Sequence, residues 1–523
     1  MKSEFFKDLH IAFVSSESDW HELKVNTLLQ NPNAKQPSIN AFLGARYSRS
    51  ADPVIDIAKE VYVSGKDAAK RLESIFFNYG HKSVGDMADL FLCLENIPIF
   101  MAQRFFYSNP VHAGQERSTR YQDFSTPRFV KLPAHLKISK ALIGEYESIY
   151  FKALDNYSSL KDKTEQAFKK YYEVNDKAGE QAMKARVFDT IRYFLPVGLQ
   201  TSIGVVMSAR SWSERISYYR ASKFIVEREL GELIFNLLNG TEELINLGYL
   251  PEADGLVRHT APDLSRATST AMIKELLKED FKQIKLDSLK TSYQVNPTEE
   301  LLDNYLQLIY PGGKVTLTKS EMAKVVIKIS KIIFSNHDHH HQLGNVAQSG
   351  SYKIEGVTDY GVLKDLIRHR SLEKFIPFLE EELDLEDIMA SDIKSMYHLC
   401  DYLDNAKLKS LRQDYDTRMQ QYYMSIRAWY IKAKDELPQD IANEFTRYLF
   451  NHGYAARYKF YGSFDDLAYT IALRTRNGGH IAYRRLTYEW LTHLTKLDPI
   501  WKALLTKLPR VDALSRDQFI DRS

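Results

Sequence analysis

Apolar positions along the chain divide it into strand-like and helical segments. Residues 90–106 form an almost continuous apolar run, which predicts a buried, strand-like segment that ends at the turn-prone residues 108–110. In residues 67–77 the apolar positions recur at helical spacing, which predicts an amphipathic helix. Residues 136–188, rich in Lys, Glu and Tyr, have the same periodicity and predict long helices with solvated faces. A shorter segment, 360–367, precedes a basic triplet.

The chain carries a charged junction near its middle. Pro251, Pro262 and Pro297 bracket a charged segment that contains one expected helix, at residues 270–286. With 523 residues the chain is long enough for two domains of ordinary size. We therefore expect the domain boundary to fall within this charged junction.

Features of the first half recur in the second half at a nearly constant distance. Arg447 lies 255 residues after Arg192, and Phe334 lies 257 residues after Phe77. Steady offsets of this size predict a duplicated domain rather than a short repeat. The expected division is an N-terminal half, a linker and a C-terminal half, at residues 1–265, 266–300 and 301–523.

Composition and charge exclude several classes of protein. The chain is 44% hydrophobic and 26% charged, and its net charge of +2 gives no reason to expect a nucleic-acid partner. No apolar run reaches the length of a membrane span, and the N-terminus lacks a signal-peptide pattern, so we expect a cytoplasmic protein without membrane contact. The two cysteines, Cys93 and Cys400, lack metal or redox spacing, and we expect unpaired core residues.

The densest group of chemically useful side chains is at residues 115–121, Gln-Glu-Arg-Ser-Thr-Arg-Tyr. Arginine supplies a planar fork of donors and Ser and Thr add shorter ones, so a loop of this composition can grip an anion. Glu116 can accept a hydrogen bond from a ribose hydroxyl or hold an arginine in place. A polar, solvated turn is the alternative interpretation of so short a motif.

This motif resembles half of the signature of the flavin-dependent thymidylate synthase family, which runs Arg-His-Arg, a short spacer, and Asn-Glu-x-Ser-x-Arg-Tyr. Arg-His-Arg is missing before residue 115 but occurs at residues 368–370, directly after the second apolar segment. The signature is therefore split between the two halves. Family active sites are assembled at the subunit interfaces of a tetramer. The resemblance thus implies two α+β halves in a pseudo-dimer, and a homodimer that mimics the tetramer.

Other positions extend the resemblance. Residues 80–83, Gly-His-Lys-Ser, match an element that lies close to the flavin in the family, and residues 208–210 match a flavin-binding turn. Arg192 matches a nucleotide-phosphate arginine, and Arg447 is its counterpart in the second half. Arg474 follows Arg447 by 27 residues, which is the interval between the two nucleotide arginines of the family.

The resemblance implies a role for each of these side chains. Arg474 would be catalytic, because a guanidinium at the N3/O2 edge of uracil makes C5 nucleophilic. The side chains expected to bind substrate are Glu116, Ser118, Thr119, Arg120, Arg368, Arg447 and Arg474, with Arg120 and Arg447 on the phosphate. The side chains expected to bind the flavin are His81, Ser83, Ser208, Arg210, Arg368, His369 and Arg370. We expect Glu116 and Ser118 to face Arg447 and Arg474, and Arg192 to lie outside this site.

The implied reaction is the reductive methylation of dUMP to dTMP at one composite site, while the other site is degenerate. Methylenetetrahydrofolate would supply the carbon and reduced FAD the hydride, with NADPH as the reductant. Asp365 stands where the family has a phosphate-contacting Gln, so a flavoenzyme of the same fold acting on another pyrimidine nucleotide is one alternative. A non-catalytic nucleotide- or flavin-binding relic is another, because each half lacks part of the signature.

Residues 337–341, His-Asp-His-His-His, open a rival interpretation as a metal site. Three consecutive histidines can ligate zinc or iron. No Glu-x-x-His helix and no cysteine pair flanks them, which favours a solvated or flavin-facing turn and no bound metal.

Overall fold

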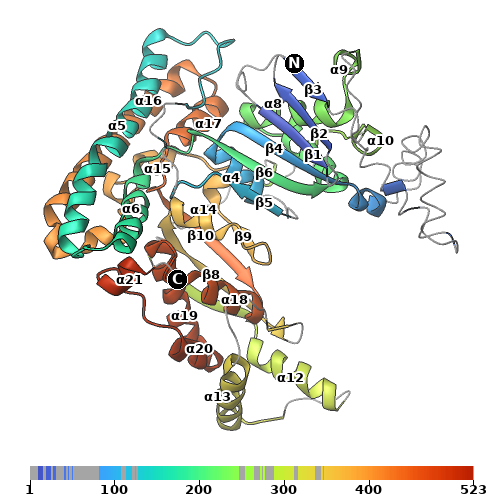
Figure 1. Cartoon of the computed structure of the whole chain (residues 1–523). Helices are drawn as coiled ribbons and strands as arrows, with labels where there is room; N and C mark the ends of the chain where they lie inside the picture. Colours follow the sequence, from blue (N-terminus) through green and yellow to red (C-terminus); the bar gives the residue numbers. More distant parts are fainter. Residues whose placement is uncertain are drawn as a thin grey trace.

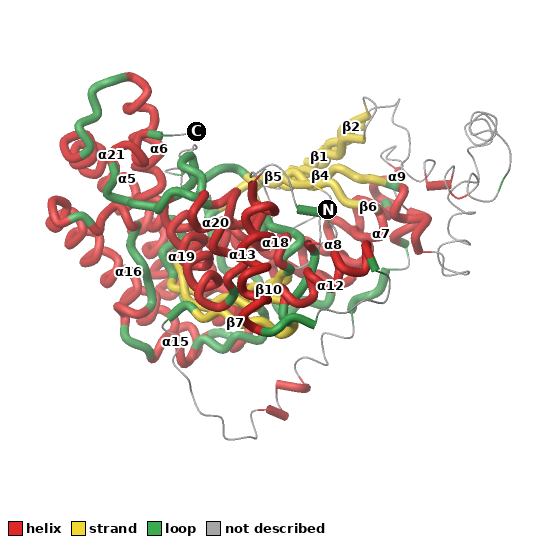
Figure 2. Tube along the Cα trace, turned by 90° about the horizontal axis from the view of Figure 1, so that it is seen from below, coloured by secondary structure: helices red, strands yellow, loops and turns green. Residues whose placement is uncertain are grey.

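The computed structural model contains two antiparallel sheets, each packed against helices (Figures 1 and 2). It describes residues 10–15, 19–24, 27–30, 41–42, 45, 50, 82–107, 113–120, 124, 128–246, 254–258, 260–263, 271–273, 275–276, 288–310, 316–335, 343–344, 347 to 521. The expected helix at 67–77, His81, most of the expected helix at 270–286 and the histidine cluster at 337–341 lie outside the described residues.

The N-terminal sheet has six strands in the order β3-β2-β1-β4-β6-β5, and each neighbouring pair is antiparallel. Alternate residues of β4 and β6 are buried, as expected for a sheet with one covered face. The strands are β1 (His10–Ser15), β2 (Asp19–Lys24), β3 (Thr27–Gln30), β4 (Asp89–Pro98), β5 (Ala113–Glu116) and β6 (Gln200–Ser208).

The apolar run at residues 90–106 is only partly a strand. Strand β4 ends at Pro98, and helix α4 (Ile99–Tyr107) follows at once. Every residue of α4 from Ile99 to Phe105 is buried, so the run shows no helical period. Periodicity alone does not distinguish a buried helix from a buried strand.

The helices predicted for residues 136–188 are confirmed as α5 (Lys140–Tyr171) and α6 (Lys177–Ile191). The side chains of Ser139 and Asp176 accept hydrogen bonds from backbone N–H groups in the first turns of these helices and define their starts. The other elements of this half are η3 (Lys82–Met87), η4 (Arg192–Phe194), α7 (Ala209–Arg220), α8 (Ile225–Asn239), α9 (Glu242–Asn246) and α10 (Asp254–Val257).

The C-terminal sheet has four antiparallel strands in the order β7-β8-β10-β9. These are β7 (Lys290–Val295), β8 (Ser351–Asp359), β9 (Glu373–Phe375) and β10 (Ala455–Gly462). The α-helices are α12 (Pro297–Ile309), α13 (Lys319–Ser335), α14 (Tyr360–Leu366), α15 (Glu386–Ala390), α16 (Lys409–Glu436), α17 (Gln439–Leu449), α18 (Phe464–Arg474), α19 (Ile481–Leu497), α20 (Lys502–Lys507) and α21 (Arg516–Ile520). Short 3₁₀ turns are η6 (Pro377–Leu379), η7 (Ile393–Ser395), η8 (Asp401–Asp404), η9 (Ala406–Leu408) and η10 (Pro499–Trp501).

Backbone hydrogen bonds join the two halves in matched pairs. Pro196 and Asn451, which are 255 residues apart, form an antiparallel bridge with each other. The flanking bonds run from Val197 N to Phe450 O and from His452 N to Leu195 O, and from Gly198 N to Tyr448 O and from Gly453 N to Tyr193 O. Each donor of one half thus has its counterpart at the equivalent position of the other half. This is the pattern of an isologous contact about a two-fold axis.

The same correspondence holds inside each half. Strand β4 leads into α4 as β8 leads into α14. Both helices begin with a bond to the residue just before the strand paired with β4 or β8: Ile99 N to Leu199 O before β6, and Tyr360 N to Tyr454 O before β10. The long helices α5 and α16 lie side by side (Figure 1), where Trp429 Nε1 donates to Leu142 O at 3.1 Å.

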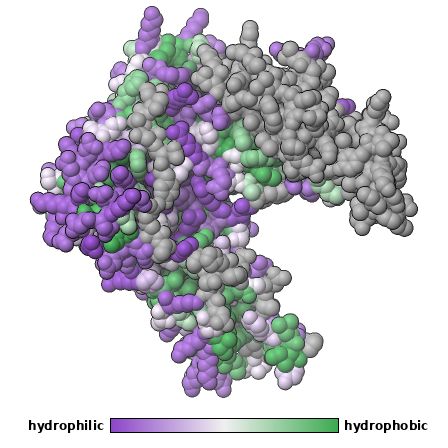
Figure 3. Space-filling model, viewed as in Figure 1, coloured by the Kyte–Doolittle hydropathy of each residue, from purple (hydrophilic) through white to green (hydrophobic). Residues whose placement is uncertain are grey.

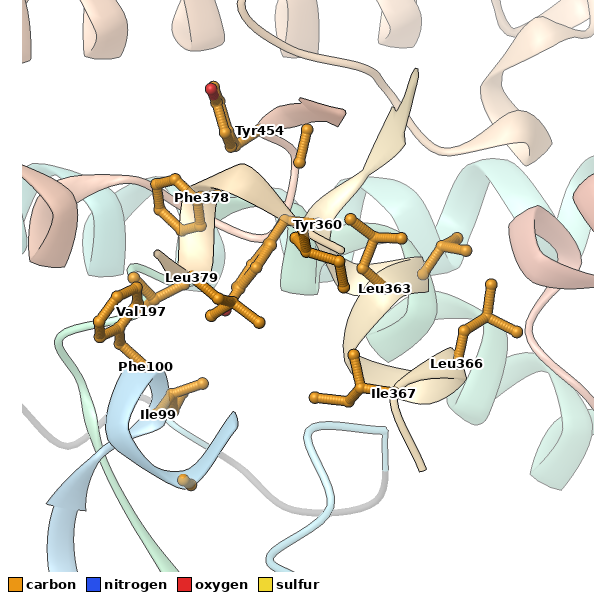
Figure 4. Close-up of a cluster of buried hydrophobic side chains, with 14 of the residues drawn as sticks. Ile99, Phe100, Val197, Tyr360, Leu363, Leu366, Ile367, Phe378, Leu379 and Tyr454 are labelled. Atoms are coloured by element: carbon orange, nitrogen blue, oxygen red, sulfur yellow. The ribbon is translucent and has the colours of Figure 1, made fainter. Parts of the chain in front are cut away.

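The two halves share one hydrophobic core. Figure 4 shows side chains from both halves in a single cluster, among them Phe100 of α4, Tyr360 of α14 and Phe378 of η6. The ring of Phe378 lies 5.7 Å from that of Phe100 and 4.8 Å from that of Tyr360. The shared core therefore fixes the positions of side chains on the facing ends of α4 and α14 relative to each other.

Apolar side chains are also exposed where α12 and α13 project from the C-terminal half (Figures 1 and 3). The most exposed are Leu308, Ile309, Tyr310 and Ile332.

Candidate functional site

Glu116, at the end of β5, forms an ion-pair network across the boundary between the halves. Its Oε1 accepts a hydrogen bond from Lys364 Nζ at 2.7 Å, and its Oε2 accepts one from an Nη2 of Arg368 at 3.3 Å. The Glu116 and Lys364 side chains are almost fully buried, whereas that of Arg368 is 34% exposed. The first half of the split signature therefore meets the second half in space.

Arg120 lies beside this network and is held by a carboxylate. Its Nε and Nη2 donate to the two oxygens of Asp189 at 2.6 and 3.0 Å, and Nη2 also donates to Gly478 O of the other half at 3.4 Å. Burial raises the pKa of Asp189, but Arg120, His480 and Arg186 outweigh burial and hold that pKa well below its usual range. A bidentate pair of this kind fixes the plane of the guanidinium.

Arg192 faces the same cluster, contrary to the expectation that it would lie outside. Its Nη2 donates to Gly361 O at 3.3 Å and lies 3.4 Å from Asp365 Oδ2. The side chain is 1% exposed, and Asp365 raises its pKa against the effect of burial. The first half thus contributes Glu116, Arg120 and Arg192 to one place.

Arg474, at the end of α18, completes the cluster from the second half. Its Nε donates to His369 Nε2 at 2.7 Å, and its Nη2 donates to Asp365 O at 2.8 Å. The guanidinium also lies over the ring of Tyr483, 5.2 Å from its centre. Three of its five N–H groups have no partner among the described residues, so they can serve a ligand.

His369 orients Arg474 through a defined tautomer. Arginine only donates, so Nε2 of His369 must accept, and the ring proton lies on Nδ1, 3.1 Å from Thr470 Oγ1. Burial, Arg474 and Lys374 all lower the pKa of His369 well below its usual value, which keeps the ring neutral. Both ring nitrogens are engaged within the protein. His369, one of the residues expected to bind the flavin, therefore has neither ring nitrogen left for that contact.

Arg447 does not reach the cluster, and the expectation that it faces Glu116 and Arg474 is wrong. It is fully buried against residues 378–383, where its guanidinium donates to backbone carbonyls. These belong to Phe378 (3.1 Å), Glu380, Glu381 (3.4 Å) and Leu383 (2.6 Å). Burial lowers the pKa of Arg447 to about 10, and Arg104 acts in the same direction.

The strand registers explain why Arg447 is enclosed. Gln115 pairs with Gly204, and Phe375 pairs with Lys459, which lies 255 residues after Gly204. The segment after β9 therefore takes the place of the 115–121 loop in the second half. Here Ile376 stands for Glu116 and Glu380 for Arg120, and the segment fills the pocket around Arg447. Nearby, Arg104 pairs with Glu227 at 2.8 Å. The pocket around Arg447 is therefore filled by residues of the protein itself.

The remaining substrate residues lie in the loop after β5. Ser118 Oγ accepts from the backbone N–H of Arg120 at 3.2 Å, and Thr119 is buried. The hydroxyl of Ser118 thus shapes the loop that presents Arg120.

The two groups of expected flavin residues are not brought together within one chain. Arg210 lies at the start of α7, where it pairs with Asp86 at 3.1 Å and with Glu214 at 3.2 Å. Ser208 Oγ donates to Asp86 at 3.1 Å, and Ser83 is exposed on the adjoining η3. Along β6 this end is about 16 Å from the residue opposite Glu116, at about 3.3 Å per residue. Arg370, by contrast, is exposed two residues after Arg368.

A separate pocket of 210 Å³ opens near the same loop. Its lining consists of Asn96, Arg117, Phe124, Arg128, Leu199, Gln200, Thr201 and Ser202. Glu116, Arg120 and the C-terminal half take no part in this lining, so the pocket is distinct from the arginine cluster.

Sequence reasoning missed two members of the cluster, Asp189 and Lys364. Lys364 stands four residues before Arg368, a spacing that places both on one face of a helical turn, so its position was a usable signal. Asp189 stands three residues before Arg192, but a lone aspartate in a long polar helix gives no sign that it will pair with a residue 69 positions earlier.

We expect Asp189→Asn to destabilise the protein at neutral pH by about 2–3 kcal/mol. The pKa of Asp189 is lower in the folded than in the unfolded chain, so its contribution is present above the unfolded value near 4 and is lost as the pH falls. Urea unfolding at pH 7 and at pH 3, between the unfolded pKa and the much lower folded pKa, measures this, with Asp162→Asn on the exposed face of α5 as the control. If Asp189→Asn lowered the free energy of unfolding equally at both pH values, the lowered pKa of Asp189 would be contradicted.

The described part of the chain holds neither a candidate membrane span nor a cluster of metal ligands. No helix there is long and apolar enough to cross a membrane. Nor does any group of three or more His, Cys, Asp or Glu side chains among those residues have the arrangement of a metal site.

Comparison with known proteins places this geometry in context. Residues 27–239 match the family model Thy1, described as thymidylate synthase complementing protein. The chain is 20% identical over 473 residues to a UPF0159 protein of Chlamydia pneumoniae. The matched region covers 86% of this chain and 82% of that protein. It is 22% identical over 370 residues to the UPF0159 protein Ta1429 of Thermoplasma acidophilum, covering 63% and 71%.

Among solved structures, the chain is similar to a UMP/dUMP methylase, PolB, from Streptomyces cacaoi, bound with 5-Br dUMP. That match has 13% sequence identity and a TM-score of 0.28, and it covers 45% of this chain and 91% of the other.

Proposed function

We propose, from the premise that residues 27–239 belong to the thymidylate synthase complementing protein family, that the whole chain is a flavin-dependent thymidylate synthase with one composite site. The observation that carries the proposal is the cluster of arginines that the two halves build together. Arg120 and Arg192 come from the first half, and Arg368 and Arg474 from the second, around Glu116 and Asp365. The proposed reaction is the methylation of dUMP to dTMP, with methylenetetrahydrofolate as the carbon donor and NADPH as the reductant.

The cluster suits a phosphorylated pyrimidine in two respects. Arg120 and Arg192 offer guanidinium groups for a phosphate. The bidentate pair with Asp189 sets the plane of Arg120, and Asp365 lies 3.4 Å from Arg192. Arg474 can aim its remaining N–H groups at the O2/N3 edge of the base, where negative charge develops as C5 becomes nucleophilic. Because His369 and the Asp365 carbonyl already fix Arg474, little reorganisation is needed during the reaction.

The chain fits a flavin in part. Arg368, one-third exposed, and the exposed Arg370 would hold its N1–C2 edge, since cations there favour the anionic reduced form. FAD, when bound, supplies the hydride that reduces the transferred carbon. Ser83, Ser208 and Arg210 lie at the far end of β6, so within this proposal they serve a flavin held partly by a second chain.

The matched hydrogen bonds between the halves support a duplicated chain, divided near residues 266–300. The filled pocket around Arg447 supports one nucleotide site per chain. A homodimer would then supply the subunit contacts that a family tetramer provides.

A combined spectroscopic and activity assay tests the proposal. The purified protein is expected to be yellow, with flavin absorbance, and to release tritium from dUMP labelled at C5 when methylenetetrahydrofolate and NADPH are present. A protein that binds flavin but releases no tritium would point to another pyrimidine nucleotide. A colourless protein that takes up no added FAD would refute flavin dependence and leave a nucleotide-binding relic.

A further inference from the structure

Tyr483 lies between two arginines of the cluster, in the first turn of α19. The guanidinium of Arg474 is 5.2 Å from the centre of its ring. Burial lowers the pKa of Arg120, but Asp189 and, to a smaller extent, Tyr483 raise it well above its ordinary value, so the Tyr483 hydroxyl lies within electrostatic range of Arg120. The tyrosine, 6% exposed, thus extends from Arg474 at its ring to Arg120 at its hydroxyl.

The turn that precedes α19 holds the hydroxyl end of Tyr483 in place. Arg186 Nη1 donates to Gly479 O of this turn at 3.0 Å, and Arg120 Nη2 donates to Gly478 O at 3.4 Å. A Cβ at Gly479 would lie 2.6 Å from the hydroxyl oxygen of Tyr483, which is closer than side chains approach each other. The hydroxyl reaches the turn because residue 479 has no side chain. It therefore lies beside the same turn that Arg120 contacts.

The hydroxyl of Tyr483 is available to a ligand. It has no hydrogen-bond partner among the described residues, and it is not sealed from solvent. A tyrosine hydroxyl can donate one hydrogen bond, and an O–H bond to an anionic oxygen is shorter and stronger than one between neutral groups. Because Arg120 lies nearby, an anion is a better partner here than a cation. The geometry therefore suits an oxygen of a phosphate that Arg120 holds.

The two ends of Tyr483 match the two ends of the proposed nucleotide. The proposed function assigns Arg474 to the base and Arg120 to the phosphate. The ring of Tyr483 contacts the first of these arginines, and its hydroxyl lies near the second. In a nucleoside 5′-monophosphate only the sugar separates the base from the phosphate. A ligand that spans both arginines therefore passes along Tyr483.

We propose that Tyr483 determines specificity at this site: its hydroxyl donates to the phosphate of the ligand, and its ring positions the guanidinium of Arg474. The inference rests on the proposed function, which assigns the base end and the phosphate end of the site. A guanidinium is attracted to the face of an aromatic ring, so the ring limits the orientations that Arg474 adopts. The hydroxyl favours a phosphorylated nucleotide over the corresponding nucleoside, in addition to Arg120 and Arg192.

Calorimetric titration with dUMP and with deoxyuridine tests the hydroxyl. Tyr483→Phe keeps the ring and should bind dUMP about tenfold more weakly than the natural protein, because a hydrogen bond to a charged group is lost. Deoxyuridine, which lacks the phosphate, should bind both proteins equally. Tyr488→Phe, at a half-buried position of the same helix, is the matched control and should bind dUMP like the natural protein. Equal dUMP affinity in Tyr483→Phe and the natural protein, or an equal loss for deoxyuridine, would overturn the proposal.

Steady-state kinetics test the ring. Tyr483→Phe should raise KM for dUMP about tenfold and affect kcat far less, since the ring beneath Arg474 remains. Tyr483→Leu removes both the hydroxyl and the ring, and it should also lower kcat by about tenfold because Arg474 is less well oriented. A kcat that is equal in the two variants would refute the role of the ring.

A second binding measurement separates this inference from the proposed function. Thermal unfolding with and without inorganic phosphate requires neither dUMP nor flavin. The natural protein and Tyr488→Phe should gain stability from phosphate, and Tyr483→Phe should gain less because its affinity for phosphate is about tenfold lower. An equal gain in all three proteins, or no gain in any, would refute the phosphate contact even where dUMP is turned over. If the gain differs as stated but dUMP does not bind, only the proposed function is refuted.

Discussion

Replacing Arg474 with alanine is expected to lower turnover by about 10²–10³-fold, the usual loss when a donor aimed at developing charge is removed. Arg474 is held by His369 Nε2 and the Asp365 carbonyl, and its remaining N–H groups point to no described partner. The loss should therefore fall mainly on the chemical step. Tritium release from C5-labelled dUMP measures the rate, and absorbance reports whether flavin stays bound.

Arg476 provides the matched control for this experiment. It lies two residues after Arg474, just beyond the end of α18, and its side chain is exposed. Arg476→Ala should retain nearly full activity. His369→Leu should fall between the two, because leucine has no acceptor to orient Arg474 but leaves the guanidinium in place. An unchanged rate in Arg474→Ala, or an equal loss in Arg476→Ala, would show that the catalytic arginine lies elsewhere.

The meeting of the two signature halves could be predicted from the sequence. Residues 115–121 carry the acid and the arginine of the family motif, and 368–370 carry the missing triplet. The resemblance to that family implied that such parts meet at an interface. The structure brings Glu116 within 3.3 Å of Arg368, which is the contact that this reasoning requires.

The choice between Arg192 and Arg447 was predicted wrongly, for a physical reason. The interval of 27 residues from Arg447 to Arg474 suggested that both serve one site. The spacing between two residues of one half stays the same whichever half each of them contacts in space. In the structure Arg192 of one half and Arg474 of the other both lie at Asp365, and the paired backbone bonds around Pro196 and Asn451 join the halves in this arrangement. Sequence spacing therefore does not show that Arg474 lies with an arginine of the other half.

The sequence also could not show that the pocket around Arg447 is filled by the protein. The segment after β9 places Ile376, Phe378 and Leu379 in the core, and Glu380 and Glu381 beside Arg104 and Arg447. Apolar residues in a loop are compatible with many packings. Only the strand register of β9 against β10 shows that this loop is the counterpart of residues 115–121.

Arg192 and Arg447 are expected to behave in opposite ways when each is replaced by alanine. Arg192→Ala should weaken dUMP binding by about 10²-fold or more, since hydrogen bonds to charged groups contribute about 1.5–3 kcal/mol each and a guanidinium can make two. Its own bonds within the protein, to Gly361 O and Asp365, are long at 3.3 and 3.4 Å. The free energy of unfolding should therefore change less than the binding energy.

Arg447→Ala should leave the nucleotide site intact but destabilise the fold by about 3–5 kcal/mol, because each buried carbonyl left without a donor costs about 1–3 kcal/mol. Four carbonyls of the segment after β9 depend on this guanidinium. Titration of the flavin-loaded protein with dUMP should give one nucleotide per chain in both the natural protein and Arg447→Ala, at a temperature where the variant stays folded. Two nucleotides per chain, or loss of binding in Arg447→Ala without loss of stability, would mean that the pocket around Arg447 is a working site and that the halves have not specialised.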